Sequence, residues 1–156
     1  MSEHSVQHGS FTIERRFDAA PARVFAAWSN PDAKAGWFGP PKEECAEFNR
    51  VFDFRVGGEE RLSGTWKKTG ITSHFHSVYF DIIENARIVY AYDLHLDDKK
   101  ISVSLATIEF KHAGKGTLLV LREDGAFLDG YDDNGAREHG TKGLVENLAR
   151  YVEAAA

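Results

Sequence analysis

The stretch 88–96 reads IVYAYDLHL, and it decides the fold because its large apolar side chains fall on every second residue. Successive side chains of a β-strand point to opposite faces, so this period of two places one set of side chains together. The members of that set are Ile88, Tyr90, Tyr92, Leu94 and Leu96. The stretch therefore predicts a strand with one face in the core.

Further strand candidates lie on both sides of this stretch. The preceding ones cover residues 45–54, 59–66 and 73–83, and the following ones cover 102–111 and 117–123. Short polar or glycine-bearing segments separate them, as at 97–100 and 114–116, and such segments form tight turns. Consecutive short strands joined by short turns predict an antiparallel meander and not βαβ units.

Helical patterns appear only toward the two ends of the chain. A strand at 10–17 is followed by two short helices, one after Pro21 and one at 32–36. At the other end, apolar residues recur at spacings of three and four, which predicts a helix of roughly twenty residues, about 30 Å long. These residues are Leu144, Leu148, Tyr151 and Val152.

A sheet with one apolar face needs a cover, and the terminal helix is the only element large enough to supply it. We therefore expect an α+β helix-grip fold of the START or Bet v type. Its curved antiparallel sheet wraps around a long C-terminal helix, and two short helices follow the first strand. The expected organisation is one domain over residues 10–156, preceded by a disordered, polar tail over residues 1–9.

Composition excludes several classes of protein. The net charge of −5 argues against nucleic acid or an anionic membrane surface as the main partner. No apolar run is long enough for membrane insertion, and residues 1–10 do not form a signal peptide, so we expect a cytoplasmic protein. The single cysteine, Cys45, excludes an internal disulfide. We predict no metal site, no cofactor and no catalytic residues, because no spacing of reactive side chains points to one.

Two histidines on the candidate strand 73–83 bring polar groups to an apolar pattern. His74 and His76 share the period of Val78 and Phe80, so all four would line the interior if that face points inward. Imidazoles there could bond a polar ligand group or titrate near neutral pH. The alternative is a pair of ordinary hydrogen-bonded histidines near the strand end, which we favour for both.

Aromatic residues supply the other candidates for the lining of a cavity. Tyr90 and Tyr92 share the inward face of strand 88–96, and a buried tyrosine needs a partner for its hydroxyl. They could line a cavity mouth or reach the edge of the core. Trp37 and Phe38, between Gly36 and the Gly39–Pro40 pair, either plug the open end of the grip or contact a ligand. We favour the plug.

The terminal helix carries two glycines one turn apart, Gly140 and Gly143, next to Leu144. Each glycine costs a helix interior about 1 kcal/mol relative to alanine, so something must approach that helix face closely. Gly140 and Leu144 are candidates for the lining of a ligand space between helix and sheet. Close packing of the helix backbone against a neighbouring element is the interpretation we favour.

Short motifs spread over the chain resemble one known family. In order they are RFDAAP at 16–21 with Val24-Phe25 and Trp28, Asn30-Pro31, WFGP at 37–40, DFRVGG at 53–58, IIE at 82–84 with RIVY at 87–90, GTL at 116–118, and Gly140-x-x-Gly143 before Leu148. Together they resemble the family named for the activator of the ninety-kilodalton heat-shock protein ATPase, in the START-like (SRPBCC) superfamily. The resemblance runs from about residue 10 to residue 153.

This resemblance implies a helix-grip fold that encloses an apolar cavity, and it implies no catalytic triad. The family pattern often has tryptophan where Thr141 stands, so the pocket here should differ in shape. The eukaryotic activators that gave the family its name carry an additional N-terminal domain that this sequence lacks, so chaperone stimulation is not implied.

Three functions remain open from the sequence. The first is a non-catalytic domain that encloses a small, mainly hydrophobic ligand, with Trp37, Phe38, His74, His76, Val78, Phe80, Tyr90, Tyr92, Gly140 and Leu144 as its lining. The second is a co-chaperone-like interaction module with a solid core. The third is a cyclase or hydrolase that uses a cavity histidine or tyrosine as acid or base. An open sheet edge also leaves a homodimer as an alternative.

Overall fold

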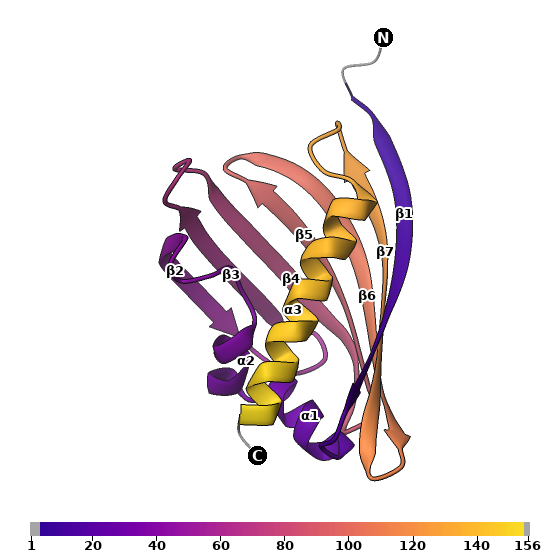
Figure 1. The fold of residues 1–156 in the computed structure, drawn as a ribbon. Coiled ribbons are helices and arrows are strands. Elements are labelled where there is room, and N and C mark those ends of the chain that lie inside the picture. The colour runs from indigo at the N-terminus through magenta and orange to yellow at the C-terminus, as the bar shows by residue number, and fades with distance from the viewer. Residues whose placement is uncertain (1–3, 155–156) are drawn as a thin grey trace.

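The computed structural model describes residues 4–154, which form one sheet and three helices (Figure 1). The strands are β1 (Val6–Phe17), β2 (Cys45–Phe52), β3 (Glu59–Trp66), β4 (Thr72–Ile83), β5 (Arg87–Leu96), β6 (Lys99–Ala113) and β7 (Gly116–Leu128). The helices are α1 (Pro21–Ser29), α2 (Pro31–Trp37) and α3 (Asn134–Ala154). The predicted order of elements is confirmed.

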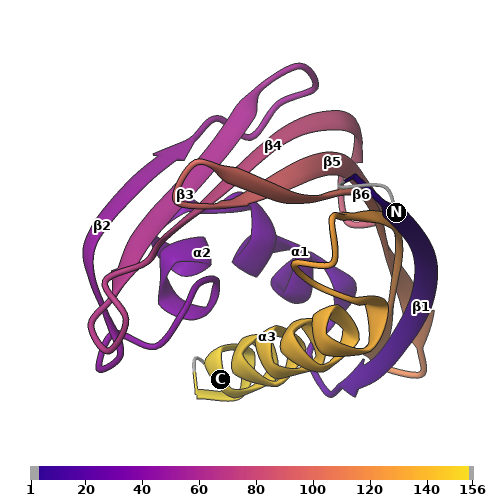
Figure 2. The same cartoon turned by 90° about the horizontal axis from the view of Figure 1, so that it is seen from above.

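All neighbouring strands are antiparallel, in the order β1-β7-β6-β5-β4-β3-β2. The sheet is therefore a meander from β2 to β7, and the N-terminal strand β1 returns to pair with β7. Viewed from above, the sheet curves around α3 (Figure 2). Helices α1 and α2 lie near the lower end of the molecule in the view of Figure 1. The predicted helix-grip architecture is confirmed.

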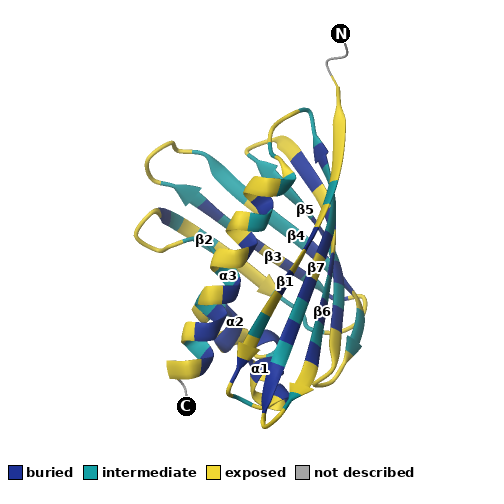
Figure 3. Cartoon of the chain, turned by 45° about the vertical axis from the view of Figure 1, so that its right-hand side comes forward, coloured by how far each residue is buried: buried dark blue, intermediate teal, exposed yellow. Residues whose placement is uncertain are grey.

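The core lies between the concave face of the sheet and the three helices. Helix α3 buries one stripe of apolar residues that includes Val145, Leu148 and Val152, and its opposite side is exposed (Figure 3). The period of two on β5 places Ile88, Tyr90 and Tyr92 inward, as predicted. At the outer edge of this layer, Arg15 of β1 donates to Glu146 of α3 at 2.9 Å, which joins the helix to the first strand.

The first strand begins earlier than expected. Val6–Gly9 belong to β1 and pair with residues 125–128 of β7, so the predicted disordered tail over residues 1–9 is wrong for this part. Apolar alternation is missing there because Val6, Gln7 and His8 are exposed, whereas backbone pairing with β7 continues through all four residues. Residues 1–3 of the predicted tail lie outside the described residues.

The prediction for the face of β4 is also wrong, and a β-bulge explains why. Ser77 and Tyr79 are buried, whereas His74 and Phe80 are exposed. The register with β5 shifts between Tyr79 and Asp81, so Phe80 is an extra residue and the alternation changes phase there. Ile82, beyond the bulge, packs against the core. Counting back from Ile82 in steps of two therefore gives Phe80, Val78, His76 and His74, which point outward.

Candidate functional site

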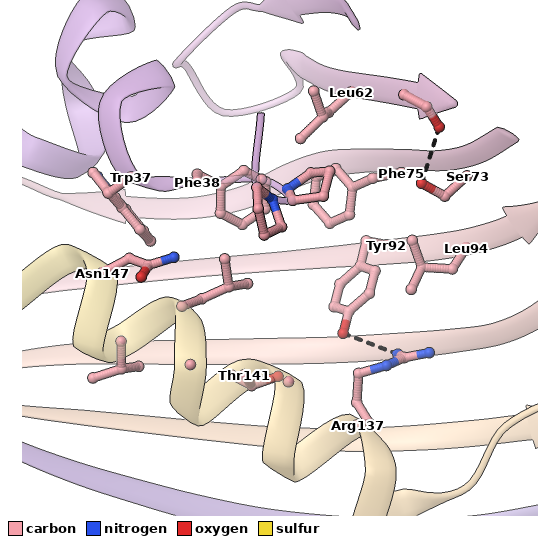
Figure 4. A pocket seen from close by; sticks show the side chains of 18 of the residues that line it. Trp37, Phe38, Leu62, Ser73, Phe75, Tyr92, Leu94, Arg137, Thr141 and Asn147 are labelled. Carbon is pink, nitrogen blue, oxygen red and sulfur yellow. Dashed lines mark hydrogen bonds between the residues drawn. The ribbon is translucent and has the colours of Figure 1, made fainter. Parts of the chain in front are cut away.

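A pocket of about 680 Å³ lies between α3 and the concave face of the sheet. This volume falls within the ~300–1,000 Å³ that is usual for small-molecule sites. In Figure 4, Arg137 of α3 reaches the hydroxyl of Tyr92 on β5, and Thr141 lies further along the same helix. The exposed members of its lining come from α3 and from the segment after α2, among them Gly143, Glu146, Arg150 and Pro41. The pocket therefore opens between α3 and the α2–β2 connection.

Aromatic side chains form one wall of the pocket. Phe38 contacts Phe75 of β4 edge to face, with ring centroids 5.1 Å apart, and Phe75 lies 5.0 Å from the ring of Tyr92. Tyr90 continues this series along β5. Trp37 is held by a hydrogen bond from its Nε1 to the Ala27 carbonyl at 2.8 Å. Contacts among the rings fix their orientation, so this apolar wall is formed without a ligand.

The helix wall is open at the two glycines. A Cβ atom added at Gly140 or at Gly143 would meet no atom within 4 Å beyond its neighbours in the helix. Close backbone packing, the interpretation favoured from the sequence, is therefore wrong. Because both residues belong to the pocket lining, the missing side chains leave space at its mouth. Leu144, one residue further on, also lines the pocket.

A buried polar cluster interrupts the otherwise apolar lining. Tyr92 of β5 donates from Oη to Oε1 of Glu123, on β7, at 2.5 Å. Arg137 of α3 donates from Nη1 to Tyr92 Oη at 3.1 Å (Figure 4). Only 4% of Glu123, 6% of Tyr92 and 8% of Arg137 is exposed. Strand β5, strand β7 and helix α3 thus bring a carboxylate, a phenol and a guanidinium together at the pocket.

Burial shifts the proton equilibria of this cluster. It raises the pKa of Glu123, while the hydrogen bond from Tyr92, the charge of Arg137 and a hydrogen bond with Thr141 act in the opposite direction. Burial, and next the Glu123 charge, raises the pKa of Tyr92. Burial alone would lower the pKa of Arg137, but Tyr92 and Asp132 raise it, so the guanidinium stays charged. Glu123 is therefore the member of the cluster that titrates most readily.

A second buried pair supports the aromatic wall from behind. Lys34 Nζ lies 2.8 Å from Glu60 Oε1, and Tyr79 Oη donates to the same oxygen at 2.6 Å. Burial lowers the pKa of Lys34, and Glu60 acts against that shift. The ammonium group lies 4.4 Å from the centroid of Phe38 and 5.7 Å from that of Trp37. This pair holds the α2 aromatics against β3 and β4 and does not itself line the pocket.

The structure brings together six of the predicted lining residues and separates the other four from them. The pocket lining includes Trp37, Phe38, Tyr90, Tyr92, Gly140 and Leu144. The four on β4 lie on the opposite face of the sheet, because the bulge at Phe80 sets their phase: His74, His76, Val78 and Phe80. His76 bonds Glu59 there at 3.2 Å, so it is a paired surface histidine.

Sequence reasoning missed Glu123 and Arg137, although both carry a signal. Glu123 continues the inward period of Leu119 and Leu121 on β7, where a carboxylate is out of place. Arg137 lies four residues before Thr141, on the buried stripe of α3. A charged residue in the inward phase of a strand or helix is expensive to bury and points to a partner or a function.

Within residues 4–154, no group of three or more His, Cys, Asp or Glu side chains is arranged to hold a metal ion. In the same part of the chain, no helix has the length and apolar character needed to cross a membrane.

Comparison with known proteins agrees with this architecture. The family described as "Activator of Hsp90 ATPase homolog 1-like protein" matches residues 18–153. A putative uncharacterized protein from Rhizobium leguminosarum is 41% identical, with a TM-score of 0.89 over 97% of this chain and 98% of its own. A protein from Rhizobium loti is 39% identical, with a TM-score of 0.85 over 94% of this chain and 99% of its own.

More distant structures share the fold alone. An AHSA1-like protein from Aeromonas hydrophila is 20% identical and has a TM-score of 0.69 over 94% of each chain. No curated protein matches the sequence. The comparisons support a family of ligand-binding or interaction modules.

Proposed function

This chain belongs to the Activator of Hsp90 ATPase homolog 1-like family, and on that premise we propose that it binds a small, mainly apolar molecule between α3 and the sheet. The observation that carries the proposal is the pocket of about 680 Å³ with aromatic residues on one side and open glycines on the other. A binding pocket commonly combines apolar walls with a few polar groups that orient the ligand. Here Glu123, Tyr92 and Arg137 are those groups.

The geometry favours a ligand over a solid core for one reason. Helix glycines reduce stability by about 1 kcal/mol each, and neither Gly140 nor Gly143 recovers that cost through packing, because no atom approaches them. A bound molecule would fill the space and bury the aromatic wall. Burial of apolar surface contributes roughly 25 cal/mol per Å² before the cost of association is subtracted.

The test is a thermal-shift screen of the purified protein against a panel of lipids and aromatic metabolites. A binder stabilises the folded state, so the melting temperature should rise with the concentration of at least one compound. The variant Gly143→Phe places a ring at the pocket mouth and should abolish the rise. Lys142→Phe is the matched control, since residue 142 is exposed on the same helix and does not line the pocket.

Two results would reject this function. The first is the absence of any shift across the panel, which the interaction-module alternative predicts. The second is a shift of equal size in wild type and Gly143→Phe, which would place the compound elsewhere on the protein. A shift that survives Lys142→Phe and disappears in Gly143→Phe supports binding in the pocket.

Acid–base chemistry on the bound molecule is a second candidate function. The distance of 2.5 Å between Tyr92 Oη and Glu123 Oε1 favours it, because two titratable groups within hydrogen-bond reach face a solvent-connected pocket. The histidine version of this hypothesis is abandoned, since His74 and His76 lie on the outer face. Mass spectrometry of each binder after incubation with wild type and with Tyr92→Phe decides the matter. Product that forms only with wild type supports chemistry, and unchanged compound excludes it for that binder.

Two expectations from the sequence stay predictions. One is the cytoplasmic location, which fractionation of the source cells would test. The other is the homodimer, which would form through the open sheet edge at β1 or β2. Sedimentation velocity over a range of protein concentrations measures it directly.

A further inference from the structure

The Glu123 carboxylate has a hydrogen-bond donor but no direct cation. Tyr92 donates from Oη to its Oε1 at 2.5 Å. Among residues 4–154, no ion pair joins Glu123 to a Lys, Arg or His side chain, although only 4% of Glu123 is exposed to solvent. Buried carboxylates are normally paired with a cation or neutralised. The pairing of Glu123 is therefore incomplete in the protein alone.

Arg137 cannot supply that cation without giving up its own partners. Its Nη2 donates to Ser102 Oγ and to Asp132 Oδ2, each at 2.8 Å. Its Nη1 donates to Tyr92 Oη at 3.1 Å and to Ser104 Oγ at 3.4 Å. These bonds use four of its five N–H groups, and they fix the guanidinium where it orients Tyr92.

The Glu123 carboxylate keeps unused capacity as an acceptor. An ionised carboxylate has roughly four lone-pair sites, and the Tyr92 hydroxyl occupies one of them. The hydrogen bond from Tyr92, 2.5 Å long, stabilises the ionised form of Glu123 against the effect of burial. Phe75 and Tyr90 line the same pocket, and aromatic rings attract a cation to their faces. A ligand group that fits these neighbours donates hydrogen bonds and carries positive charge.

We propose that the ligand of this pocket is a protonated amine on an apolar, ring-sized body, with its ammonium group bound to the Glu123 carboxylate. This inference rests on the proposed binding function and names the chemical class of the ligand. The apolar body lies against the aromatic wall, and the ammonium group completes the pairing of the buried carboxylate. Tyr92 positions Glu123 for that contact.

Three probes of one shape test the charge preference by calorimetry: naphthylethylamine, naphthylethanol and naphthylacetic acid. Wild type should bind the amine at least about tenfold more tightly than the alcohol, because an ammonium–carboxylate pair in a desolvated site exceeds a neutral hydrogen bond. The acid should bind weakest. Glu123→Gln, which keeps the side-chain shape, should weaken binding of the amine by a larger factor than binding of the alcohol, so that the ratio of the two affinities falls toward one.

The pH dependence of wild-type binding gives the same test without a variant. As pH falls through the interval around the folded-state pKa of Glu123, which burial raises from its ordinary value, protonation removes the charge and the ratio of amine to alcohol affinity should fall. The groups that face Glu123 are Tyr90 and Tyr92 of β5 and Arg137 of α3, with Asp132 beyond Arg137. Glu146 and Arg150 line the mouth. Burial raises the pKa of both tyrosines and Arg137 stays charged, so those three do not titrate in this interval.

The outcomes separate this inference from the proposed function. Equal affinity for amine and alcohol, or tightest binding of the acid, overturns the inference and leaves the pocket a binding site. An equal loss of all three affinities in Glu123→Gln also overturns it, because that is the effect of a structural residue. Binding of none of the probes by wild type overturns the inference, and the compound panel then decides the proposed function independently.

Discussion

Replacement of Lys34 by methionine should destabilise the protein severely, because it isolates a buried carboxylate. Lys34 and Glu60 are 2% and 4% exposed, and their charged atoms are 2.8 Å apart. Removal of one partner from a buried ion pair costs about 3–5 kcal/mol. For a chain of this length each kcal/mol lowers the melting temperature by roughly 2–4 °C. We therefore expect Lys34→Met to melt about 6–20 °C below wild type.

Urea unfolding followed by tryptophan fluorescence measures this loss of stability with probes next to the substitution. The ring centroids of Trp28 and Trp37 lie within 5.7 Å of the Lys34 ammonium group. The double variant Lys34→Met/Glu60→Gln removes both charges, and Tyr79 can still donate to the amide oxygen. It should recover most of the loss, because a buried pair replaced as a whole is often close to neutral. The matched control is Lys142→Met, which breaks an exposed pair with Glu138 and should cost no more than ~0.5 kcal/mol.

Two results would refute the reasoning. A cost below ~1 kcal/mol for Lys34→Met would mean that Glu60 finds another partner or water, contrary to its burial. A double variant at least as unstable as Lys34→Met would mean that packing around the lysine stem, and not the unpaired charge, causes the loss. Either result would also weaken the view that this pair holds Trp37 and Phe38 in the wall of the pocket.

Three further predictions concern the pocket itself. Gly140→Ala and Gly143→Ala should each raise the free energy of unfolding in urea by about 0.8–1 kcal/mol, and a loss in either would show that the helix face is packed. Because folding raises the pKa of Glu123, protonation of this residue stabilises the folded state below about pH 4.5, and that stabilisation is lost as pH rises through the folded-state pKa. In urea titrations, wild type should therefore lose stability relative to Glu123→Gln as pH rises through this range. Curves of unfolding free energy against pH that run parallel for the two proteins would contradict the shift. Tyr92→Phe should cost about 1–3 kcal/mol in thermal melts, because it removes a donor from Glu123 and an acceptor from Arg137, and an unchanged melt would remove the cluster from the account.

The architecture follows from patterns that act locally along the chain. Alternation on β5, short turns and the three-and-four spacing on α3 each reflect burial of one face, so the order of elements could be predicted. The pairing of Val6–Gly9 with β7 could not, because Val6, Gln7 and His8 are exposed and backbone hydrogen bonds leave no trace in side-chain pattern. Strand β1 is therefore longer than its apolar residues indicate.

The site was harder to predict, because it depends on phase and on contacts between distant elements. One extra residue at Phe80 reverses the faces of β4 and sends His74 and His76 outward. The polar cluster joins β5, β7 and α3, and no short-range spacing links Tyr92 to Glu123 or Arg137. Trp37 and Phe38 could be placed at the pocket because they lie at the end of the short helix α2, whose position could be predicted from local sequence.

The central claim is that a small molecule occupies the pocket between α3 and the sheet with its ammonium group at Glu123. The most direct measurement is an NMR titration of ¹⁵N-labelled wild-type protein with naphthylethylamine. Binding in the pocket should give saturable shifts of the Gly140 and Gly143 amides and of Thr141, together with contacts between the naphthyl protons and Phe75. Shifts confined to the outer face of β4, or no saturable shift at either glycine, would contradict it.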